Sequence, residues 1–452
     1  MGVPTGSVVA ILLRNEPAYL EALSCIRALQ GVRVQIPWHF TATEIQPILS
    51  DIVPAVIIIH EDLWPLIAAW TSHHPQVYIA VVCTPEDIAR IFALPKHCLN
   101  HKPVGALRWE ELIAEAPQAL PITGRPPPAI SITSGSTGAP KIVRWNPTPR
   151  TAQWQPQHTL NQPAIVTSIV TAPMYHSAQH GMLTQAWLQR ANLVILPAFD
   201  AEEFLAAIER YRVNHAYTVP SMFVRLLKLP RHVRERYDLS SLNFVFHAGA
   251  PCAANVKRAM LSWLGPVIWE AYGCSEAGTI SFCPSAEWLQ RPGTVGRPMR
   301  TVAILDDQHD ILPCGATGQI WVDVRNGHEW VATGDVGHLD ADGFLYLSGR
   351  ADGLITTSQI KVYPAEIEQA ILAHPAILDC TVFAVSDAEC GQTIAAVVEM
   401  REPIANIEQE LKGFLSGRIS EYKIPVMIRE SRASMWRDTG KLDRAAFAAV
   451  FQ

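Results

Sequence analysis

A short segment rich in hydroxyl groups and glycine is the first place where this sequence could do chemistry. It reads SITSGSTGAPK from Ser131 to Lys141 and follows an apolar run that ends at Ile130. Small residues let backbone amides approach anionic oxygens closely, and serine and threonine hydroxyls add further donors. With a lysine cation at its end, the segment is typical of a phosphate-binding loop, but an ordinary polar surface turn has the same composition.

The spacing of glycines excludes three common loop motifs. A Walker loop requires glycine at the fifth position after its first glycine and lysine at the sixth, and here Pro140 stands five after Gly135. The sequence contains no GxG, which a dinucleotide-binding loop requires. The nucleophile elbow GxSxG is also missing, because GCSEAG at 273–278 spaces its glycines too widely. The assignment of the loop therefore depends on other segments.

Further segments give the loop a family context. SITSGSTGAPK resembles the phosphate loop of the adenylate-forming superfamily, which contains acyl- and aryl-CoA synthetases, nonribosomal adenylation domains and luciferases. Segments similar to other motifs of this family follow in the family's order: HAGAP at 247–251, EAYGCSEAG at 270–278, ATGDVG at 332–337, GRADGLITTSQIKVYPAEIE at 349–368 and TGKLDR at 439–444. The resemblance spans nearly the whole chain and is strongest to bacterial acyl- or aryl-CoA ligases.

The resemblance implies a binding site for ATP. Asp335 would accept hydrogen bonds from the ribose hydroxyls, because a carboxylate can accept two at once, and Arg350 would reach the sugar or the phosphates. Tyr272 would stack on adenine. The residues implied at the phosphates are Thr133, Ser134, Gly135, Ser136, Thr137, Gly138 and Lys141. Those implied around the base are Gly249, Ala250, Pro251, Gly273 and Ser275.

The resemblance also implies three catalytic residues. In this family a carboxylate attacks the α-phosphorus of ATP and expels pyrophosphate. Lys441 would bridge the α-phosphate and the attacking carboxylate, and Thr133 would act from the phosphate loop. Glu276 would anchor Mg²⁺, a hard cation that takes carboxylate and phosphate oxygens together. Position alone favours a solvent-exposed lysine near the terminus, and the residues flanking Lys441 reverse that preference.

The segment PMYHSAQHG at 173–181 resembles the family segment that borders the acyl pocket. The residues expected to shape the pocket are Tyr175, His176, Phe246, His247, Cys274 and Thr279. This mixture of aromatic and small side chains suits an aryl or medium-length acyl acid, and none of them would pair with an amino acid's ammonium group. His176 and His180 stand four apart and could share a helical face as metal ligands, but no third ligand and no HExxH motif accompany them.

The resemblance implies a second half-reaction. A small C-terminal domain would rotate about a hinge at Asp352, and a thiol would then attack the acyl-adenylate to give a thioester and AMP. We expect coenzyme A as the acceptor. The alternative is the phosphopantetheine arm of an acyl carrier protein, because Thr357, Ser358 and Gln359 stand where family members usually carry glycine. A nucleotide-binding regulator without turnover is disfavoured by the presence of Glu276, Asp335 and Lys441.

The elements that must position these residues follow the pattern of an α/β protein. Short apolar runs alternate with helical patterns through the first half of the chain, as in βα units. Strands are expected at 8–13, 55–59, 77–82, 192–197, 215–219 and 243–247, and helices at 17–29 and 202–213.

The texture of the sequence changes from about residue 301, where closely spaced strand signals indicate a small β-rich subdomain. After GRADG at 349–353 the pattern becomes helix, strand, strand, helix, at 364–373, 380–385, 393–399 and 407–417. We therefore expect an N-terminal domain at 1–349 that binds ATP and the carboxylate. A mobile C-terminal α+β domain at 350–452 would carry the catalytic lysine.

Composition limits the partners. The chain has 452 residues, of which 49% are hydrophobic and 17% charged, with a formal net charge of −6. This balance is typical of a compact enzyme and gives no electrostatic reason to expect nucleic acid or an anionic membrane. The nine cysteines include no CxxC pair, which argues against a disulfide framework or a zinc site.

The N-terminal segment has no signal-peptide pattern, and no apolar run is long enough to span a bilayer, so we expect a cytoplasmic protein without a membrane span. Compared with common family members the sequence begins late, without a strand and a helix that pack on the large domain. A naturally short form, a homodimer that covers the gap, or a wrongly assigned start codon would each account for this.

Overall fold

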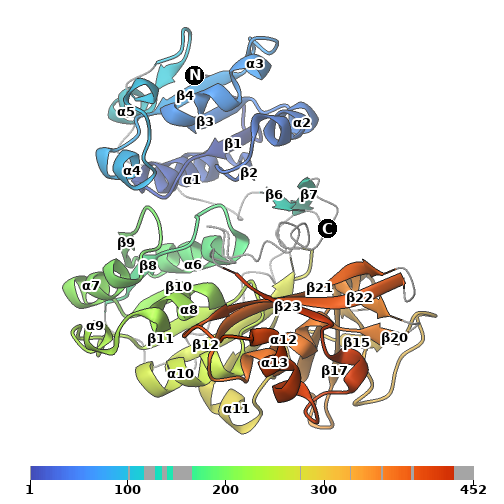
Figure 1. The fold of residues 1–452 in the computed structure, drawn as a ribbon. Helices are drawn as coiled ribbons and strands as arrows, with labels where there is room; N and C mark the ends of the chain where they lie inside the picture. The colour runs from blue at the N-terminus through green and yellow to red at the C-terminus, as the bar shows by residue number, and fades with distance from the viewer. Residues whose placement is uncertain are drawn as a thin grey trace. The chain divides into compact units, whose positions relative to one another are not determined.

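The computed structural model describes residues 2–99, 102–116, 128–134, 140–145, 165–274, 276–325, 327–357, 360–387 and 391–431. The chain forms two compact units, Met1–Asp200 and Ala201–Gln452 (Figure 1). The mixture of strands and helices in both units confirms the expected α/β class.

The first unit contains a sheet with the strand order β5-β4-β3-β1-β2-β6-β7. Its strands are β1 (Val8–Leu12), β2 (Val32–Gln35), β3 (Val56–His60), β4 (Tyr78–Val82), β5 (Leu107–Arg108), β6 (Ala129–Ser134) and β7 (Pro140–Trp145). All neighbouring strands pair in parallel except β6 and β7, which pair antiparallel. Because the chain crosses from β2 over β1 to β3, the sheet has a topological switch point between β1 and β3.

Helices cover both faces of this sheet, which explains why β1 is apolar at every position. Ala10 and Leu12 pack in one buried cluster with residues of α2 (Ala42–Ile52), and Val9 and Ile11 pack in another with residues of α1 (Pro17–Leu29). A strand buried on both faces reads as a continuous apolar run. The other elements of this unit are η1 (Glu61–Leu66), α3 (Ala68–Thr71), α4 (Glu86–Ile91), η2 (Lys96–Cys98), α5 (Trp109–Ala114), β8 (Thr167–Val170), α6 (Ser177–Leu188) and β9 (Asn192–Ile195).

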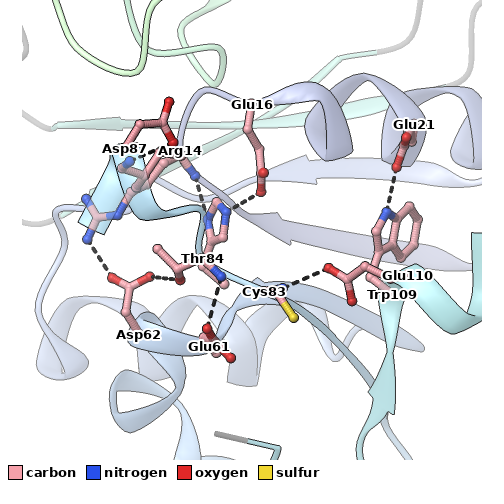
Figure 2. Close-up of polar contacts among 12 residues, drawn as sticks. Arg14, Glu16, Glu21, Glu61, Asp62, Cys83, Thr84, Asp87, Trp109 and Glu110 are labelled. Carbon is pink, nitrogen blue, oxygen red and sulfur yellow. Dashed lines mark hydrogen bonds and ion pairs between the residues drawn. The ribbon is translucent and has the colours of Figure 1, made fainter. Parts of the chain in front are cut away.

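Paired charges fill the carboxyl edge of this sheet beside the switch point (Figure 2). Arg14, which follows β1, donates to Asp62 after β3 at 2.7 Å, and its guanidinium lies 4.2 Å from the centre of the Phe92 ring. Thr84, after β4, donates through its hydroxyl to Asp62 at 2.8 Å and through its backbone N–H to Glu61 at 3.1 Å. Doubly wound sheets commonly bind ligands at such an edge, whereas here Arg14, Asp62 and Thr84 bond to one another.

The described strands of the second unit, β10 to β23, belong to four sheets. β10 (His215–Thr218), β11 (Phe244–His247) and β12 (Ile268–Cys274) are parallel, and β13 (Gly278–Pro284) and β14 (Arg297–Pro298) continue the sheet antiparallel. Its helices are α7 (Ala201–Tyr211), α8 (Pro220–Lys228), α9 (Arg231–Arg234), α10 (Ala254–Leu264) and α11 (Ser285–Gln290). The expected β-rich subdomain is the antiparallel sheet of β15 (Val302–Leu305), β16 (Gly318–Asp323), β17 (Trp330–Leu339) and β18 (Leu345–Arg350).

The C-terminal part of the second unit has a hydrophobic core of its own, which includes Ile355, Ile367, Val382, Val398 and Leu411. Its elements are η4 (Ala351–Gly353), β19 (Ile355–Thr357), β20 (Ile360–Val362), α12 (Pro364–Leu372), β21 (Ile377–Asp387), β22 (Gly391–Met400), α13 (Ile407–Leu415), η5 (Glu421–Lys423) and β23 (Met427–Glu430). The expected order of helix, strand, strand and helix is confirmed. Among all described helices, none combines the length and apolar character needed to cross a membrane.

A buried histidine makes the stability of the second unit sensitive to acid. His215 on β10 packs edge-on against Phe244, and its Nε2 has no hydrogen-bond partner among the described residues. Burial lowers the pKa of His215 to about 4, from its usual 6.5. The unfolded chain therefore takes up the proton first as the pH falls, and this contribution to stability is lost between pH 6.5 and about 4.

We expect His215→Leu to weaken the acid dependence of the free energy of unfolding. The slope between pH 6.5 and 4 should become shallower by up to about 1.4 kcal/mol per pH unit, the value for one proton. Urea unfolding at a series of pH values measures the slope. The matched control is His232→Leu at an exposed position of α9, which should leave it unchanged. Equal slopes in wild type and His215→Leu would contradict the assignment.

Candidate functional site

The second unit brings three of the predicted nucleotide-binding residues together. The Tyr272 hydroxyl on β12 donates to Oδ2 of Asp335 on β17 at 2.8 Å, and Nη1 of Arg350 on β18 donates to Oδ1 of Asp335 at 3.3 Å. Each carboxylate oxygen thus receives a hydrogen bond, one from a phenol and one from a guanidinium. The Asp335 side chain is 17% exposed and the Arg350 side chain 47%. Solvent-facing hydroxyl groups of a ligand can therefore reach this carboxylate.

The strands fix this arrangement through their register and one glycine. Asp335 and Arg350 are direct cross-strand partners in the antiparallel pair of β17 and β18. Between Thr333 and Asp335, Gly334 has φ of 75°, and a Cβ there would lie 2.7 Å from Nη2 of Arg350. The Thr333 carbonyl accepts from Arg350 at 3.1 Å, and its hydroxyl accepts from the Asp335 backbone N–H at 3.1 Å. The Thr-Gly-Asp motif is therefore needed for the conformation of the chain as well as for its carboxylate.

The protonation of Tyr272 suits its role as a donor. Burial raises the pKa of the Tyr272 hydroxyl, and the Asp335 charge raises it further. The phenol consequently stays protonated and holds Asp335 in place. Its ring is 7% exposed and packs with Ile280, Val295 and other apolar side chains.

The turn between β12 and β13 carries the predicted magnesium ligand. Glu276 lies exposed in this turn, and the strands approach so closely that a Cβ on Gly273 would lie 2.3 Å from the Gly278 carbonyl oxygen. Cys274, at the end of β12, is half-buried, and burial raises the pKa of its thiol, with a smaller contribution from the Glu276 charge. The tight hairpin presents Glu276 at its tip and keeps Cys274 a neutral thiol.

The loop after β11, at residues 249–251, consists of small residues, so a ligand beside it would contact mainly its backbone. Gly249 has φ of 87°, and a Cβ there would stand 3.6 Å from the Tyr217 hydroxyl, an ordinary contact. Gly249 and Pro251 are exposed and Ala250 is half-buried. Such small residues can leave room for a flat ring beside the loop.

The other predicted pocket residues of the second unit differ in burial. Phe246 is buried near Tyr217 and Phe282, with ring centroids 5.7 and 5.9 Å away, and Thr279 is half-buried. His247 is fully buried, and its Nε2 lies 3.8 Å from Glu270. Burial and the Lys257 cation lower the pKa of His247 well below its usual value, so its ring is neutral.

A buried ion pair lies beside His247. Lys257 of α10 and Glu270 of β12 are in contact at 2.5 Å, and the lysine ammonium stands 5.0 Å from the centre of the Trp288 ring. Removing one partner of such a pair leaves an uncompensated charge and typically costs about 3–5 kcal/mol. The pair therefore fixes α10 against the strand that carries Tyr272.

In the first unit, three buried side-chain amides hold the segment that carries Tyr175 and His176. Asn15 donates to the carbonyls of Ala172 at 3.0 Å and Leu196 at 3.2 Å, and its Oδ1 accepts from the Met174 backbone N–H at 2.9 Å. Gln35 donates to the Met174 carbonyl at 3.2 Å and to the Tyr19 hydroxyl at 2.6 Å. The Gln179 side-chain oxygen accepts from the Ala172 N–H at 3.3 Å.

These amides hold the two ends of the segment. Between them, the Tyr175 and His176 rings pack against each other. Tyr175 is buried, its hydroxyl lies 3.1 Å from Nδ1 of His39, and its ring lies 4.5 Å from that of His176. His176 is the residue before α6, and His180 follows one turn later, with its N–H bonded to the His176 carbonyl at 2.8 Å. The predicted pocket wall is thus a rigid strand-to-helix turn.

The predicted phosphate loop is the connection of a hairpin. β6 and β7 pair antiparallel with Thr133 opposite Lys141 and Ser134 opposite Pro140. The side chains of Thr133, Ser134 and Lys141 lie outside the described residues, and Asp352 is placed only by its backbone, in η4. The remaining predicted residues outside the described part are Gly135, Ser136, Thr137, Gly138, Ser275 and Lys441.

Sequence reasoning did not single out Asn15, Gln35, Gln179 or Thr333. Asn15 does give a signal, because it follows closely on an apolar strand pattern, where a buried amide must find partners. Gln35 gives none, because Arg33 interrupts the apolar pattern of its strand. Gln179 looks like any helix-surface glutamine until the fold buries it. No group of three or more His, Cys, Asp or Glu within the described segments could hold a metal ion.

Comparisons with known proteins agree with this geometry. The family model for the AMP-binding enzyme matches residues 1–329, and the model for its C-terminal domain matches residues 366–434. A feruloyl-CoA synthase of an Amycolatopsis species is 27% identical over 467 residues, covering 98% of this chain and 88% of that protein. An indoleacetate–CoA ligase of Aromatoleum aromaticum is 27% identical over 456 residues, covering 94% and 84%.

A solved structure supports the fold. An anthranilate CoA ligase in complex with anthranoyl-AMP superimposes with a TM-score of 0.85 at 23% identity, covering 99% of this chain and 88% of that one. At this identity the likeness establishes the arrangement of elements and leaves the chemistry to the residues themselves.

We expect Asn15→Leu to lower the free energy of unfolding by about 3 kcal/mol, because two buried carbonyls and one N–H lose their partner at once. Urea unfolding at neutral pH measures the change. Asn192→Leu, the same replacement at an exposed position of β9, should change it by less than about 0.5 kcal/mol. If the two variants behave alike, the three hydrogen bonds do not hold the segment.

Proposed function

The chain belongs to the family of AMP-binding enzymes, and on that premise we propose that it joins a carboxylic acid to a thiol in two steps. In the first, an oxygen of the acid's carboxylate attacks the α-phosphorus of ATP, and the bond to pyrophosphate breaks, giving an acyl-adenylate. In the second, the sulfur of a thiol attacks the acyl carbon and AMP leaves, giving a thioester. The protein is an acid–thiol ligase.

One observation carries the proposal: Tyr272, Asp335 and Arg350 form a single hydrogen-bonded group from three different strands. The Asp335 carboxylate is oriented from both sides and is 17% exposed, and a carboxylate can accept hydrogen bonds from the two vicinal hydroxyls of a ribose. The Arg350 guanidinium supplies positive charge beside it, for the phosphate side of the nucleotide. The exposed backbone of Gly249–Pro251 gives a surface for the base.

The phosphate contacts rest on the loop closed by β6 and β7. We propose that the hydroxyls and amides of residues 133–138 and the Lys141 ammonium receive the β- and γ-phosphates. Glu276, an exposed carboxylate, fits Mg²⁺, which takes few protein oxygens and completes its shell with water and phosphate. When bound, Mg²⁺ would offset phosphate charge as pyrophosphate leaves. Lys441 would stabilise the charge where the carboxylate meets the α-phosphate.

For the acid, we propose an aryl or medium-length acyl compound. In the first unit, Tyr175 and His176 offer aromatic rings. In the second unit, Phe246 offers an aromatic ring, and Cys274 and Thr279 offer small side chains. Burial keeps the Cys274 thiol protonated, so it presents an apolar surface rather than a charge. The named relatives act on ferulate and indoleacetate, both of which carry a flat ring, and this supports the aryl class.

For the acceptor, we propose coenzyme A, as in the named CoA ligases. An acyl carrier protein is the second candidate, because the Gln359 side chain stands where the family usually has glycine. We propose that residues 1–349 bind ATP and the acid and that residues 350–452 form the mobile domain, with a hinge at Asp352. The separate hydrophobic core of the C-terminal part, around Ile367 and Leu411, supports this division.

The proposed function is tested by measuring pyrophosphate release from ATP over a panel of aryl and aliphatic carboxylic acids. We expect release that depends on the acid, and a product with the mass of the acyl thioester when coenzyme A is added. Asp335→Ala should raise the KM for ATP about 10- to 100-fold, since two charged hydrogen bonds are lost. ATP binding without release for any acid would instead indicate a nucleotide-binding regulator. A product formed only with a carrier protein would identify the second acceptor.

We expect Lys441→Ala to lower pyrophosphate release about 10²- to 10³-fold, the usual effect of removing one preorganised donor at a reacting centre. Thioester formation from a supplied acyl-adenylate should stay largely intact, because the lysine serves only the first step. Lys102→Ala, on the exposed surface of the first unit, is the control. Equal loss of both steps would refute the role assigned to Lys441.

A further inference from the structure

A half-buried cation, Arg33, lies next to the segment predicted to border the acid pocket and has no counter-charge among the described residues. Arg33 stands on β2, a strand whose other face is apolar, and its Nη1 contacts Nε2 of His180 on α6. No carboxylate among the described residues forms an ion pair with it. Residues 1–200 outside the described segments contain no Asp and no Glu, so the first unit has no other acid to offer.

Arg33 and His180 each have a hydrogen-bond donor without an acceptor among the described residues. Burial and the Arg33 charge lower the pKa of His180 well below its usual value, so its ring is neutral. Since Nε2 faces a guanidinium N–H and must accept, the proton of the ring lies on Nδ1. That Nδ1 and the Nε of Arg33 are both buried without a partner in the described part of the chain.

The Arg33 guanidinium keeps one edge, formed by Nε and Nη2, on the side away from His180. Nη1 is occupied by His180, which leaves the edge formed by Nε and Nη2, and neither of these atoms has a hydrogen-bond partner among the described residues. This edge presents two parallel N–H groups, the geometry that binds both oxygens of a carboxylate. Burial lowers the pKa of Arg33 to about 10, so it is still a cation at neutral pH.

The position of the pair relates it to the acid rather than to the phosphates. Arg33 and Gln35 alternate onto the same face of β2, and Gln35 bonds to the Met174 carbonyl, next to Tyr175. His180 lies one helical turn beyond His176. By contrast, Arg33 is level with Ala129 on β6, four residues, or about 13 Å along the strand, before Thr133, the first residue predicted to contact the phosphates.

We propose that Arg33 and His180 bind a second carboxylate of the acid substrate, so that the enzyme prefers dicarboxylic acids over monocarboxylic acids of the same length. This inference rests on the proposed function. One carboxylate is activated by ATP, and the other lies against the Nε and Nη2 edge of Arg33. The cation then gains a counter-charge that no described residue supplies, and buried unpaired donors gain acceptors.

The test compares matched acids. Acid-dependent pyrophosphate release is measured for adipate against hexanoate and for 4-carboxyphenylacetate against phenylacetate, with wild type, Arg33→Met, Arg33→Lys and His180→Leu. In wild type, kcat/KM should be at least about 10-fold higher for the dicarboxylate of each pair, because a site built for a polar group discriminates strongly against its absence. Arg33→Met should abolish that preference and leave the monocarboxylate within about threefold. Arg33→Lys should retain part of it, since charge remains without the two-pronged geometry.

A binding measurement covers the case in which a variant is inactive. Adipate should raise the melting temperature of wild type and of the control Arg90→Met, an exposed arginine of α4, and should leave that of Arg33→Met unchanged. Arg33→Met should fold, because methionine replaces an uncompensated buried charge with apolar volume.

The outcomes separate the two proposals. Turnover of monocarboxylates without a preference for their dicarboxylate partners, or a preference that survives in Arg33→Met, would overturn the inference and leave the ligase function standing. Binding of adipate to wild type and Arg33→Met alike would overturn it in the same way. Failure of every acid of the panel to release pyrophosphate would count against the ligase function itself.

Discussion

A polar group that is withdrawn from water must find a partner inside the protein, and this constraint organises every part of the structure that bears on function. The carboxyl edge of the first sheet is the clearest example. Arg14, Asp62, Glu61 and Thr84 are bonded to one another there, beside the switch point of the sheet. Because the strand ends are tied together by these contacts, the turns that leave them have fixed directions. Asn15 lies on one of those turns.

The same constraint acts in each of the two units. In the first unit, the buried amides of Asn15, Gln35 and Gln179 form hydrogen bonds with the backbone instead of with water. These bonds hold the turn before α6 in place. In the second, Tyr272, Asp335 and Arg350 orient one another, and the buried Lys257–Glu270 pair secures α10 to the strand that carries Tyr272. Groups that are held by partners on several sides lose little freedom when a ligand binds, so less of the binding free energy is spent on ordering them.

Arg33 and His180 combine a cation with two buried nitrogen atoms that have no partner among the described residues, and for that reason they are informative. A charge buried without a counter-charge is unfavourable for folding, so it is retained at the expense of stability. Perturbed ionisable groups of this kind concentrate at functional sites. The contrast with Lys257, which is equally cationic but fully paired with Glu270, separates a residue that serves the fold from one that has capacity left for a ligand.

The sequence by itself determined the fold class, most strands and helices, and the ordered motifs that identify the family, because these depend on local periodicity and on short contiguous patterns. It also indicated Asp335 and Arg350 as partners of one ligand. It did not predict β2, since Arg33 and Gln35 interrupt the apolar pattern of VRVQ. Only the tertiary structure decided which polar residues are buried and what they meet: Asn15 against Ala172, Tyr272 against Asp335, Arg33 against His180. These pairs join residues far apart in the chain, and the free energy of a buried polar group depends on its neighbours in space, which no local pattern records.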